Sequence, residues 1–155
     1  MKAVLGFDIH KLVPGRKCII CGVEIPYEKG LLGHSDGDVG IHALIDAICA
    51  GTGLPDIGIF FPDTDPQYKN ISSITLLQKV LKKIEPLNVQ FKHVDFTFIC
   101  DKPKLSSYYE KMKKNIANFL KIESNLISIK AKTTEGLMWN KKEEAIACFC
   151  VLTLE

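Results

Sequence analysis

Two histidines and an aspartate that lie far apart in the chain have the types and spacing of metal ligands. Asp8 and His10 are separated by one residue in a segment with the alternation of a β-strand. Alternate residues of a strand share a face, so both side chains point the same way. His42 lies in an apolar segment with helical periodicity. Three protein ligands with a fourth position open are the arrangement of a catalytic zinc site.

The segment from 34 to 46 places polar residues at the start of that helix. It reads His-Ser-Asp-Gly-Asp-Val-Gly-Ile-His-Ala-Leu-Ile-Asp. Asp38 is expected to cap the helix, because the first N–H groups of a helix lack internal partners. Asp38, His42 and Asp46 recur every four residues and therefore share one stripe. Such a stripe on an apolar helix needs partners, since burying charge without them is costly.

Each of these residues also has an ordinary structural interpretation. Asp38 is then only a cap, His10 a surface histidine, and His42 a core histidine with satisfied hydrogen bonds. The joint pattern, an Asp-x-His strand and an acidic glycine-containing turn leading into a helical histidine, favours the metal site instead.

Composition limits the remaining classes. The chain has 155 residues, which fits one domain, and a net charge of +2. This balance gives no case for nucleic-acid binding, and no apolar run reaches the length of a membrane span. The N-terminus lacks the apolar core and cleavage site of a signal peptide. We therefore expect a cytoplasmic protein, or a plastid one if a transit peptide was removed.

Six cysteines stand at positions 18, 21, 49, 100, 148 and 150. The spacing of Cys18 and Cys21 also suits a redox or zinc pair. All six lie in apolar runs, however, where free cysteine behaves as a small buried hydrophobe. We expect reduced, buried thiols, which fit a cytosolic type of compartment.

The patterns predict a single α+β domain. Strands are expected at 2–10, 89–101, 126–133 and 145–154, with a small edge hairpin at 18–26. Helices are expected from 38 to about 50, from 73 to 84 and from 106 to 121. The result is a mixed four-stranded sheet with the helices on one face. Residues 30–38 and 55–70 are expected to be functional loops, the second because loops of that length are uncommon in compact domains.

The last expected strand is apolar on both sides. Ala147, Phe149 and Val151 alternate with Cys148, Cys150 and Leu152. A sheet with helices on one face leaves its other face uncovered. The uncovered face is therefore expected to pack against further copies of the chain; the alternative is that loops cover it.

Several motifs together resemble one enzyme family. They are Gly6-Phe7-Asp8-Ile9-His10, Leu31-Leu32-Gly33-His34-Ser35-Asp36-Gly37-Asp38, Asp56-Ile57-Gly58 and Phe61-Pro62-Asp63-Thr64-Asp65-Pro66. In this order the chain resembles the 2-C-methyl-D-erythritol 2,4-cyclodiphosphate synthases of the non-mevalonate isoprenoid pathway. These lyases convert 4-diphosphocytidyl-2-C-methyl-D-erythritol 2-phosphate to the cyclic diphosphate and release CMP. The family forms homotrimers with sheets around a central axis and active sites between subunits.

The resemblance also implies roles for individual residues. Asp8, His10 and His42 would bind Zn²⁺, and Glu135 a second divalent ion, Mg²⁺ or Mn²⁺. His34 and Thr133 would stabilise the transition state, with Asp46 a partner of a ligand imidazole. Substrate contacts are implied for Ser35, Asp56, Ile57, Gly58, Phe61, Asp63, Asp65, Lys132, Thr134, Trp139 and Lys142. The cytidine pocket maps to Cys100, Asp101, Lys102, Pro103, Lys104, Leu105 and Ser106, contributed by the neighbouring subunit relative to the zinc.

The segment after Glu135 departs from the family pattern. The family usually continues with Lys-Leu-Gly-Phe and a Gly-Arg-Gly-Glu-Gly run. Here Gly136 to Ala145 lacks three of those glycines, and Lys142 replaces the arginine. Lysine does not reproduce the bidentate phosphate recognition of arginine. The resemblance therefore does not establish whether a central cavity of this protein binds isoprenoid diphosphates.

Two other functions fit part of the pattern. One is a zinc-dependent phosphoesterase that uses water as its nucleophile, which would yield hydrolysis products. The other is a non-catalytic protein that binds nucleotides or isoprenoid diphosphates, for which no zinc is needed. The presence of all the implied ligands favours the synthase.

Overall fold

The computed structural model describes residues 1–137 and 144–155. Its centre is a five-stranded mixed sheet in the order β4-β1-β7-β5-β6. The strands are β1 (Lys2–Pro14), β4 (Lys29–Leu32), β5 (Phe91–Ile99), β6 (Ile127–Lys132) and β7 (Ala145–Leu154). β5 and β6 are parallel and the other pairs are antiparallel. A separate hairpin, as expected, consists of β2 (Cys18–Ile20) and β3 (Val23–Ile25).

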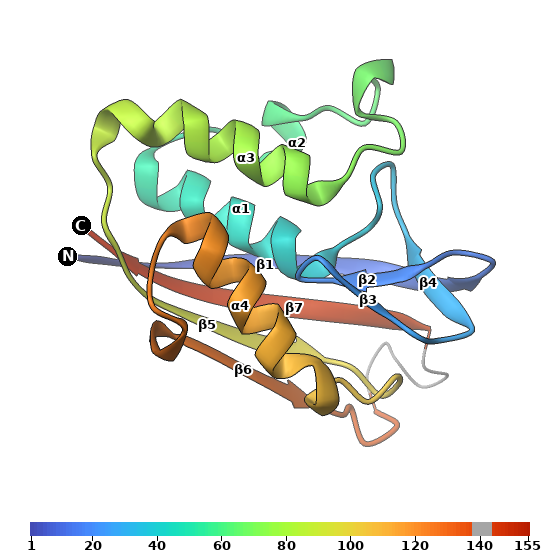
Figure 1. The fold of residues 1–155 in the computed structure, drawn as a ribbon. Helices are drawn as coiled ribbons and strands as arrows, with labels where there is room; N and C mark the ends of the chain where they lie inside the picture. The colour runs from blue at the N-terminus through green and yellow to red at the C-terminus, as the bar shows by residue number, and fades with distance from the viewer. Residues whose placement is uncertain (138–143) are drawn as a thin grey trace.

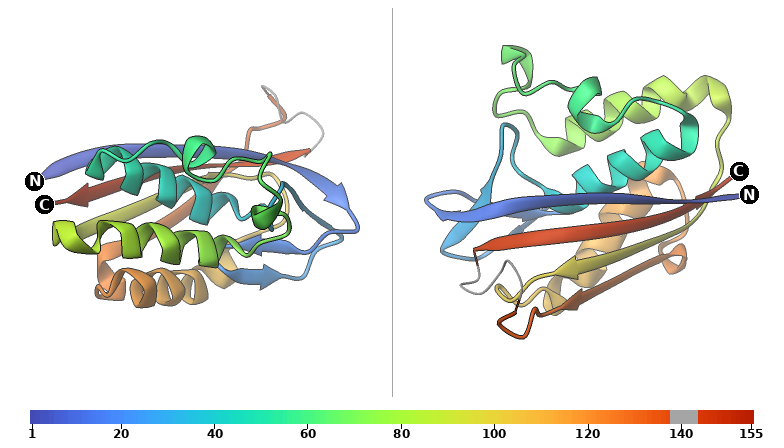
Figure 2. Two further views of the ribbon diagram at one scale, coloured as in Figure 1. Left: turned by 90° about the horizontal axis from the view of Figure 1, so that it is seen from above. Right: turned by 180° about the vertical axis from the view of Figure 1, so that it is seen from behind.

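The helices lie on one face of the sheet (Figures 1 and 2). They are α1 (Val39–Thr52), α3 (Ser73–Ile84), α4 (Tyr109–Leu120) and the four-residue α2 (Ile57–Phe60). Short 3₁₀ turns are η1 (Pro66–Tyr68), η2 (Glu85–Leu87), η3 (Ser106–Tyr108) and η4 (Ser124–Leu126). The expected α+β class, with helices on one face, is confirmed. Among the described residues, no helix combines the length and apolar character that crossing a bilayer requires.

The core lies between the sheet and the helices. Val94, Phe96 and Phe98 of β5 point into it and are fully buried. All six cysteines are buried and free, and burial raises the pKa of each thiol, that of Cys100 to about 12. The interpretation of the cysteines as buried hydrophobes is confirmed.

The expected number of strands was wrong, because β4 adds a fifth. Residues 29–32 belong to the sheet rather than to a loop, and β1 continues past its expected end at residue 10. The extension pairs Lys11 with Leu32 and Pro14 with Lys29. The pairing of β1 with β7 already ends at Lys11, so the missing N–H of Pro14 does not interrupt that ladder. Proline is tolerated at such a position. The loop expected at 55–70 likewise contains α2 and η1.

The face of the sheet opposite the helices exposes apolar side chains of β1 and β7. We call this set the open-face patch; its exposed members are Leu5, Phe7, Ile9, Phe149 and Val151. The rings of Phe7 and Phe149 are cross-strand neighbours with centroids 4.8 Å apart. The expected two-sided apolar character of the last strand is therefore confirmed.

Gly6 allows α1 to approach β1 closely. A Cβ atom at this position would lie 2.0 Å from the carbonyl oxygen of Ala43 and 2.6 Å from the nitrogen of Ala47. Such distances are sterically forbidden, so only glycine lets the helix backbone rest on the strand. This contact places His42, the neighbour of Ala43, above the strand residues that follow Gly6.

Asp38 joins the start of α1 to the β2–β3 hairpin. Its carboxylate caps the helix by accepting the N–H of Ile41, and it also accepts the N–H groups of Cys21 and Gly22 at 2.8 and 2.7 Å. Burial, assisted by nearby Asp36, raises the pKa of the Asp38 carboxyl to about 6, although these three N–H groups oppose the shift. The carboxylate thus satisfies donors on two elements at once.

Replacing Asp38 with alanine is expected to lower the free energy of unfolding by about 3–5 kcal/mol, because the change leaves three buried N–H groups without partners. Denaturant unfolding at a fixed chain concentration measures this loss. Ser72→Ala is the control, since Ser72 caps α3 through one exposed hydrogen bond; about 1 kcal/mol is expected there. Equal losses in the two variants would contradict the role of Asp38.

Candidate metal centre and active site

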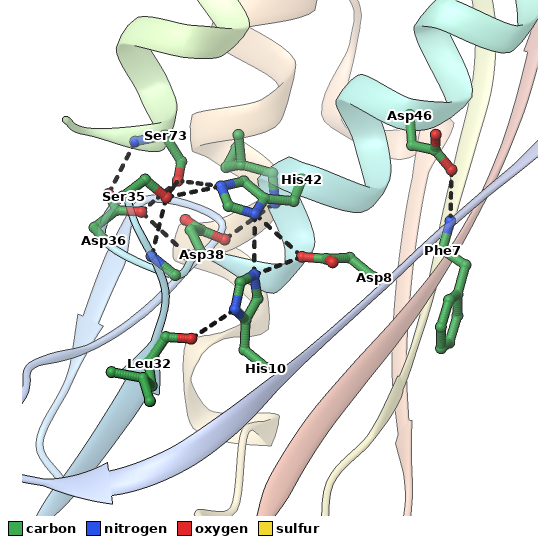
Figure 3. Close-up of polar contacts among 12 residues, drawn as sticks. Phe7, Asp8, His10, Leu32, Ser35, Asp36, Asp38, His42, Asp46 and Ser73 are labelled. Atoms are coloured by element: carbon green, nitrogen blue, oxygen red, sulfur yellow. Dashed lines mark hydrogen bonds and ion pairs between the residues drawn. The ribbon is translucent and has the colours of Figure 1, made fainter. Parts of the chain in front are cut away.

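Three side chains from two elements converge at the predicted metal site (Figure 3). Asp8 and His10 project from the same side of β1, and His42 projects from the first turn of α1. Asp8 Oδ2 lies 2.8 Å from His10 Nε2 and 3.1 Å from His42 Nδ1, and those two nitrogens are 3.1 Å apart. In the described ranges, 1–137 and 144–155, Asp8, His10 and His42 form a group of side chains that lie close enough together to share one ion.

The geometry and chemistry of this triad fit a zinc ion. Zinc bonds of about 2.0–2.1 Å in a tetrahedron separate neighbouring ligand atoms by about 3.3 Å. The three separations of 2.8 to 3.1 Å approach that value before any adjustment. One carboxylate and two imidazoles are also a common ligand set for catalytic zinc.

The triad already favours the protonation state that a metal requires of its carboxylate. Burial alone raises the pKa of Asp8, but the contacts with the His10 ring and then with the His42 ring outweigh it and lower this pKa to about 2. Burial likewise lowers the pKa of His10, and the contact with Asp8 reverses the shift so that the pKa is raised. Asp8 is therefore ionised at neutral pH, and a bound cation would take the place of a shared proton.

Partners outside the triad orient both imidazoles. His10 Nδ1 lies 2.7 Å from the carbonyl oxygen of Leu32, which can only accept, so this nitrogen carries the proton. His42 Nε2 lies 3.0 Å from Ser35 Oγ and 2.8 Å from Ser73 Oγ. Contacts of this kind fix the tautomer of a metal-binding histidine. Ser73 and the Leu32 carbonyl were missed by the sequence reasoning.

Asp46 has a different role from the one expected. Its carboxylate accepts the backbone N–H of Phe7 at 3.1 Å instead of a ring N–H of His10 or His42 (Figure 3). At Phe7, β1 pairs with β7 on one side, and β4 joins its other side only from Lys11 onward. Asp46 therefore caps an unpaired edge N–H one residue before Asp8 and fixes the strand rather than the imidazole.

A pocket of about 360 Å³ opens beside the triad. It brings together the three proposed ligands and several other predicted site residues, which are His34, Ser35, Ile57, Gly58, Phe61 and Asp63. Leu32, Gly33, Tyr68, Ile71 and Leu76 complete its lining. Residues from two expected loops, far apart in sequence, thus meet over one metal site.

Two predicted substrate contacts, Asp56 and Asp65, are not among the lining residues of this pocket. The Asp56 side chain caps α2 by accepting the N–H groups of Gly58 and Ile59. Asp65 accepts the N–H of Gln67 with its side chain, and its backbone carbonyl lies 3.4 Å from His34 Nε2. Both aspartates therefore shape the loop from 56 to 68.

The remaining predicted residues form a second cluster at the ends of β5 and β6. The N–H of Cys100 donates to the carbonyl of Lys132, and Asp101 accepts both the N–H and the hydroxyl of Thr134 at 2.8 Å. Thr133 Oγ1 donates to the Glu135 carboxylate at 2.6 Å. The predicted cytidine segment 100–106 and the predicted phosphate segment 132–135 are therefore neighbours.

This second cluster is separated from the triad within one chain. In the sheet order β5 lies two strands and β6 three strands away from β1, about 10 and 14 Å at the usual strand spacing. Ile99 pairs with Ala147 and Lys132, whereas His10 pairs with Ile146, so both sites lie toward the same end of the sheet. Trp139 and Lys142, also predicted to contact substrate, lie outside the described residues.

Comparison with known proteins identifies the family. The model of the YgbB family matches residues 1–155. The chain belongs to the YgbB family. It is 50% identical over 153 residues to the 2-C-methyl-D-erythritol 2,4-cyclodiphosphate synthase of Caldicellulosiruptor bescii, covering 99% of this chain and 98% of the relative. It is 47% identical to the Clostridium botulinum enzyme of that name over 155 residues and the full length of both.

Solved structures agree with this assignment. A CDP-bound form of 2-C-methyl-D-erythritol 2,4-cyclodiphosphate synthase superposes with a TM-score of 0.90 at 31% identity, covering 99% of this chain and 100% of that one. IspF of Plasmodium falciparum in complex with CDP gives a TM-score of 0.84 at 32% identity, covering 99% and 94%. The family resemblance seen in the sequence motifs is therefore confirmed, and it extends over the whole chain.

Proposed function

We propose that this protein is a zinc-dependent 2-C-methyl-D-erythritol 2,4-cyclodiphosphate synthase. The observation that carries the proposal is the pocket in which Asp8, His10 and His42 face His34 and Ser35. The full-length relatives at 47–50% identity support the same activity. The substrate is 4-diphosphocytidyl-2-C-methyl-D-erythritol 2-phosphate, and the products are the cyclic diphosphate and CMP.

The reaction needs no nucleophile from the protein. An oxygen of the substrate's 2-phosphate attacks the β-phosphorus, the bond from that phosphorus to the α-phosphate oxygen breaks, and the electron pair leaves on CMP. Catalysis then consists of holding two anionic groups in line and stabilising the charge that develops. An imidazole and hydroxyls beside the phosphates suit this task better than a Ser-His-Asp triad.

Asp8, His10 and His42 would hold the zinc ion, which when bound polarises a phosphoryl oxygen as a Lewis acid. His34 and Ser35, on the loop that follows β4, would hydrogen-bond the reacting phosphate. Asp56 and the backbone at Ile57 and Gly58 would bind the methylerythritol hydroxyls, with Phe61, Asp63 and Asp65 shaping this end of the pocket.

The second cluster would bind the cytidine diphosphate part of the substrate. Lys132, Thr133 and Thr134 offer a cation and hydroxyls to phosphate oxygens. Glu135 would bind Mg²⁺ or Mn²⁺, hard cations that favour oxygen ligands. Residues 100–106 would form the cytidine pocket, mostly through backbone groups.

We infer a homotrimer in which each active site combines the triad of one chain with the second cluster of its neighbour. The open-face patch supports this assembly, because exposed apolar faces mark protein interfaces. The separation of the two clusters within one chain, about 10 to 14 Å from strand spacing, supports it as well. The buried free thiols and the lack of any membrane-crossing helix among the described residues are compatible with a cytoplasmic enzyme.

Product analysis tests the proposed reaction. Purified protein with Zn²⁺ and Mg²⁺ is incubated with the substrate, and the products are followed by ³¹P NMR. Equal amounts of cyclic diphosphate and CMP are expected. Open-chain phosphates with CMP would instead indicate the water-dependent phosphoesterase, and recovery of unchanged substrate would indicate a binding protein.

Arg16 holds the loop that carries His34 and Ser35. Its Nε donates to the carbonyl of Leu31 at 2.7 Å, and its Nη2 donates to the carbonyl of Ser35 at 2.8 Å. Arg16→Lys keeps the charge but loses the fork-shaped guanidinium, whose two N–H donors bind both carbonyls. The value of kcat/KM is therefore expected to fall about 10-fold, equivalent to about 1.4 kcal/mol. Steady-state kinetics measure the loss. Lys17→Ala, an exposed neighbour, should leave kcat/KM unchanged; an unchanged Arg16→Lys enzyme would contradict the role of the fork.

A further inference from the structure

Ser73 occupies an unusual place for a serine at the start of a helix. It is the first residue of α3 and is completely buried, whereas the preceding Ser72 provides the N-cap and bonds the N–H of Ile74. The hydroxyl of Ser73 is therefore not needed to cap the helix. Instead it points toward the ring of His42, with Oγ 2.8 Å from Nε2 (Figure 3).

Asp36 determines the direction in which Ser73 uses its single hydroxyl proton. One carboxylate oxygen of Asp36 accepts the Ser73 hydroxyl, and the other accepts the Ser73 N–H at 3.0 Å. An ionised carboxylate only accepts hydrogen bonds. The Ser73 proton therefore goes to Asp36, and Oγ faces His42 Nε2 with a lone pair.

The consequence for His42 is a fixed tautomer. Since Ser73 Oγ can only accept from the ring, Nε2 must carry the ring proton. Nδ1 is then left with a lone pair, and it is Nδ1 that faces Asp8 and His10 at 3.1 Å. Only this tautomer can bind a cation at Nδ1 without first losing a proton.

We propose that Ser73, held by Asp36, is a positioning residue that keeps the Nδ1 lone pair of His42 directed at the metal site. The proposal rests on the zinc site of the proposed function but not on the cyclisation chemistry. Ser73 does not line the proposed substrate pocket, and its hydroxyl contacts His42 at Nε2 rather than at the ligand atom Nδ1. Its Oγ also lies 3.4 Å from Ser35 Oγ.

The contacts that remain without Ser73 favour the opposite tautomer. Ser35 Oγ lies 3.0 Å from the same Nε2 and, unlike Ser73, has no carboxylate to take its proton. It could then donate to Nε2, while Asp8 accepts a proton from Nδ1. In that arrangement the ring proton occupies the position of the metal. Loss of the Ser73–Asp36 pair should therefore reverse the tautomer and not only loosen the ring.

Two variants test the pair by different routes. Ser73→Ala removes the acceptor, and Asp36→Ala keeps every atom that touches the ring but frees the Ser73 proton to be donated to Nε2. Ser72→Ala is the matched control, because it alters the adjacent serine of the same helix without touching His42. The ring nitrogens of His42 are observed in metal-free, ¹⁵N-labelled protein by long-range ¹H–¹⁵N correlation, and zinc affinity is measured by competition with a chelating dye.

The wild type and Ser72→Ala are expected to show the proton on Nε2. Both Ser73→Ala and Asp36→Ala are expected to move it to Nδ1 and to weaken zinc binding by about 10- to 100-fold. If the wild type binds zinc and both variants keep its tautomer and affinity, the role of Ser73 is overturned while the zinc site stands. A wild type that binds no zinc would overturn the zinc site and, with it, this inference.

Discussion

Replacing His42 with alanine is expected to remove the zinc ion and reduce turnover by at least about 1,000-fold. The side chain supplies one of three ligand atoms that lie within 4.8 Å of one another. With one ligand lost, two side chains remain for an ion that requires at least three. Stabilisation of phosphoryl charge by a metal contributes several kcal/mol, and about 4 kcal/mol corresponds to that factor in rate. Metal content per chain and steady-state turnover are the measurements.

His34→Ala separates loss of the metal from loss of catalysis. His34 lines the same pocket but is outside the triad, so this variant should retain one zinc per chain while its turnover falls. Wild-type protein stripped of metal with a chelator should behave like His42→Ala, and adding Zn²⁺ should restore only the wild type. Full turnover in metal-free protein would contradict the proposed role of the triad.

Strong periodicity predicted the elements that hold the proposed metal ligands. Asp8 and His10 share one face because β1 alternates strictly, and His42 lies one turn beyond the cap at Asp38. These are local rules, so a single sequence contains them. The motifs that indicated the family lie within the first 66 residues. The relatives match the chain over its full length.

The contacts that the sequence did not predict depend on tertiary structure. β4 has four residues, including Gly30, which is too short for a clear alternation, and it exists because β1 offers it a pairing edge. Asp46 has the right spacing to reach toward His42, but a spacing of four does not show that Phe7 offers a closer N–H. Helical spacing identifies neighbours on the same helix and not partners on another element.

Ser73 illustrates the same limit for the site. It is 31 positions from His42, and in the sequence alone the Ser72-Ser73 doublet offers only two possible caps for the helix that follows. A helix uses one N-cap residue, so the second serine of such a doublet has a free hydroxyl. That signal was available in the sequence, but its target was not, because α1 and α3 are brought together only by the fold.

Replacing Phe149 with aspartate is expected to dissociate the proposed trimer. Phe149 belongs to the open-face patch, packs against Phe7 across β1 and β7, and is 39% exposed in the single chain. A charge buried there in every copy would cost several kcal/mol each, whereas the isolated chain would keep that charge in water.

Light scattering should show a mass near 17.3 kDa for the variant and about three times that for the wild type. If each site combines the triad of one chain with the second cluster of another, turnover should disappear together with assembly. Leu87→Asp is the matched control, because Leu87 is 56% exposed on η2, away from this face, and it should remain trimeric and active. A Phe149→Asp monomer that keeps the turnover of the wild type would refute the shared site, since one chain would then hold a complete active site.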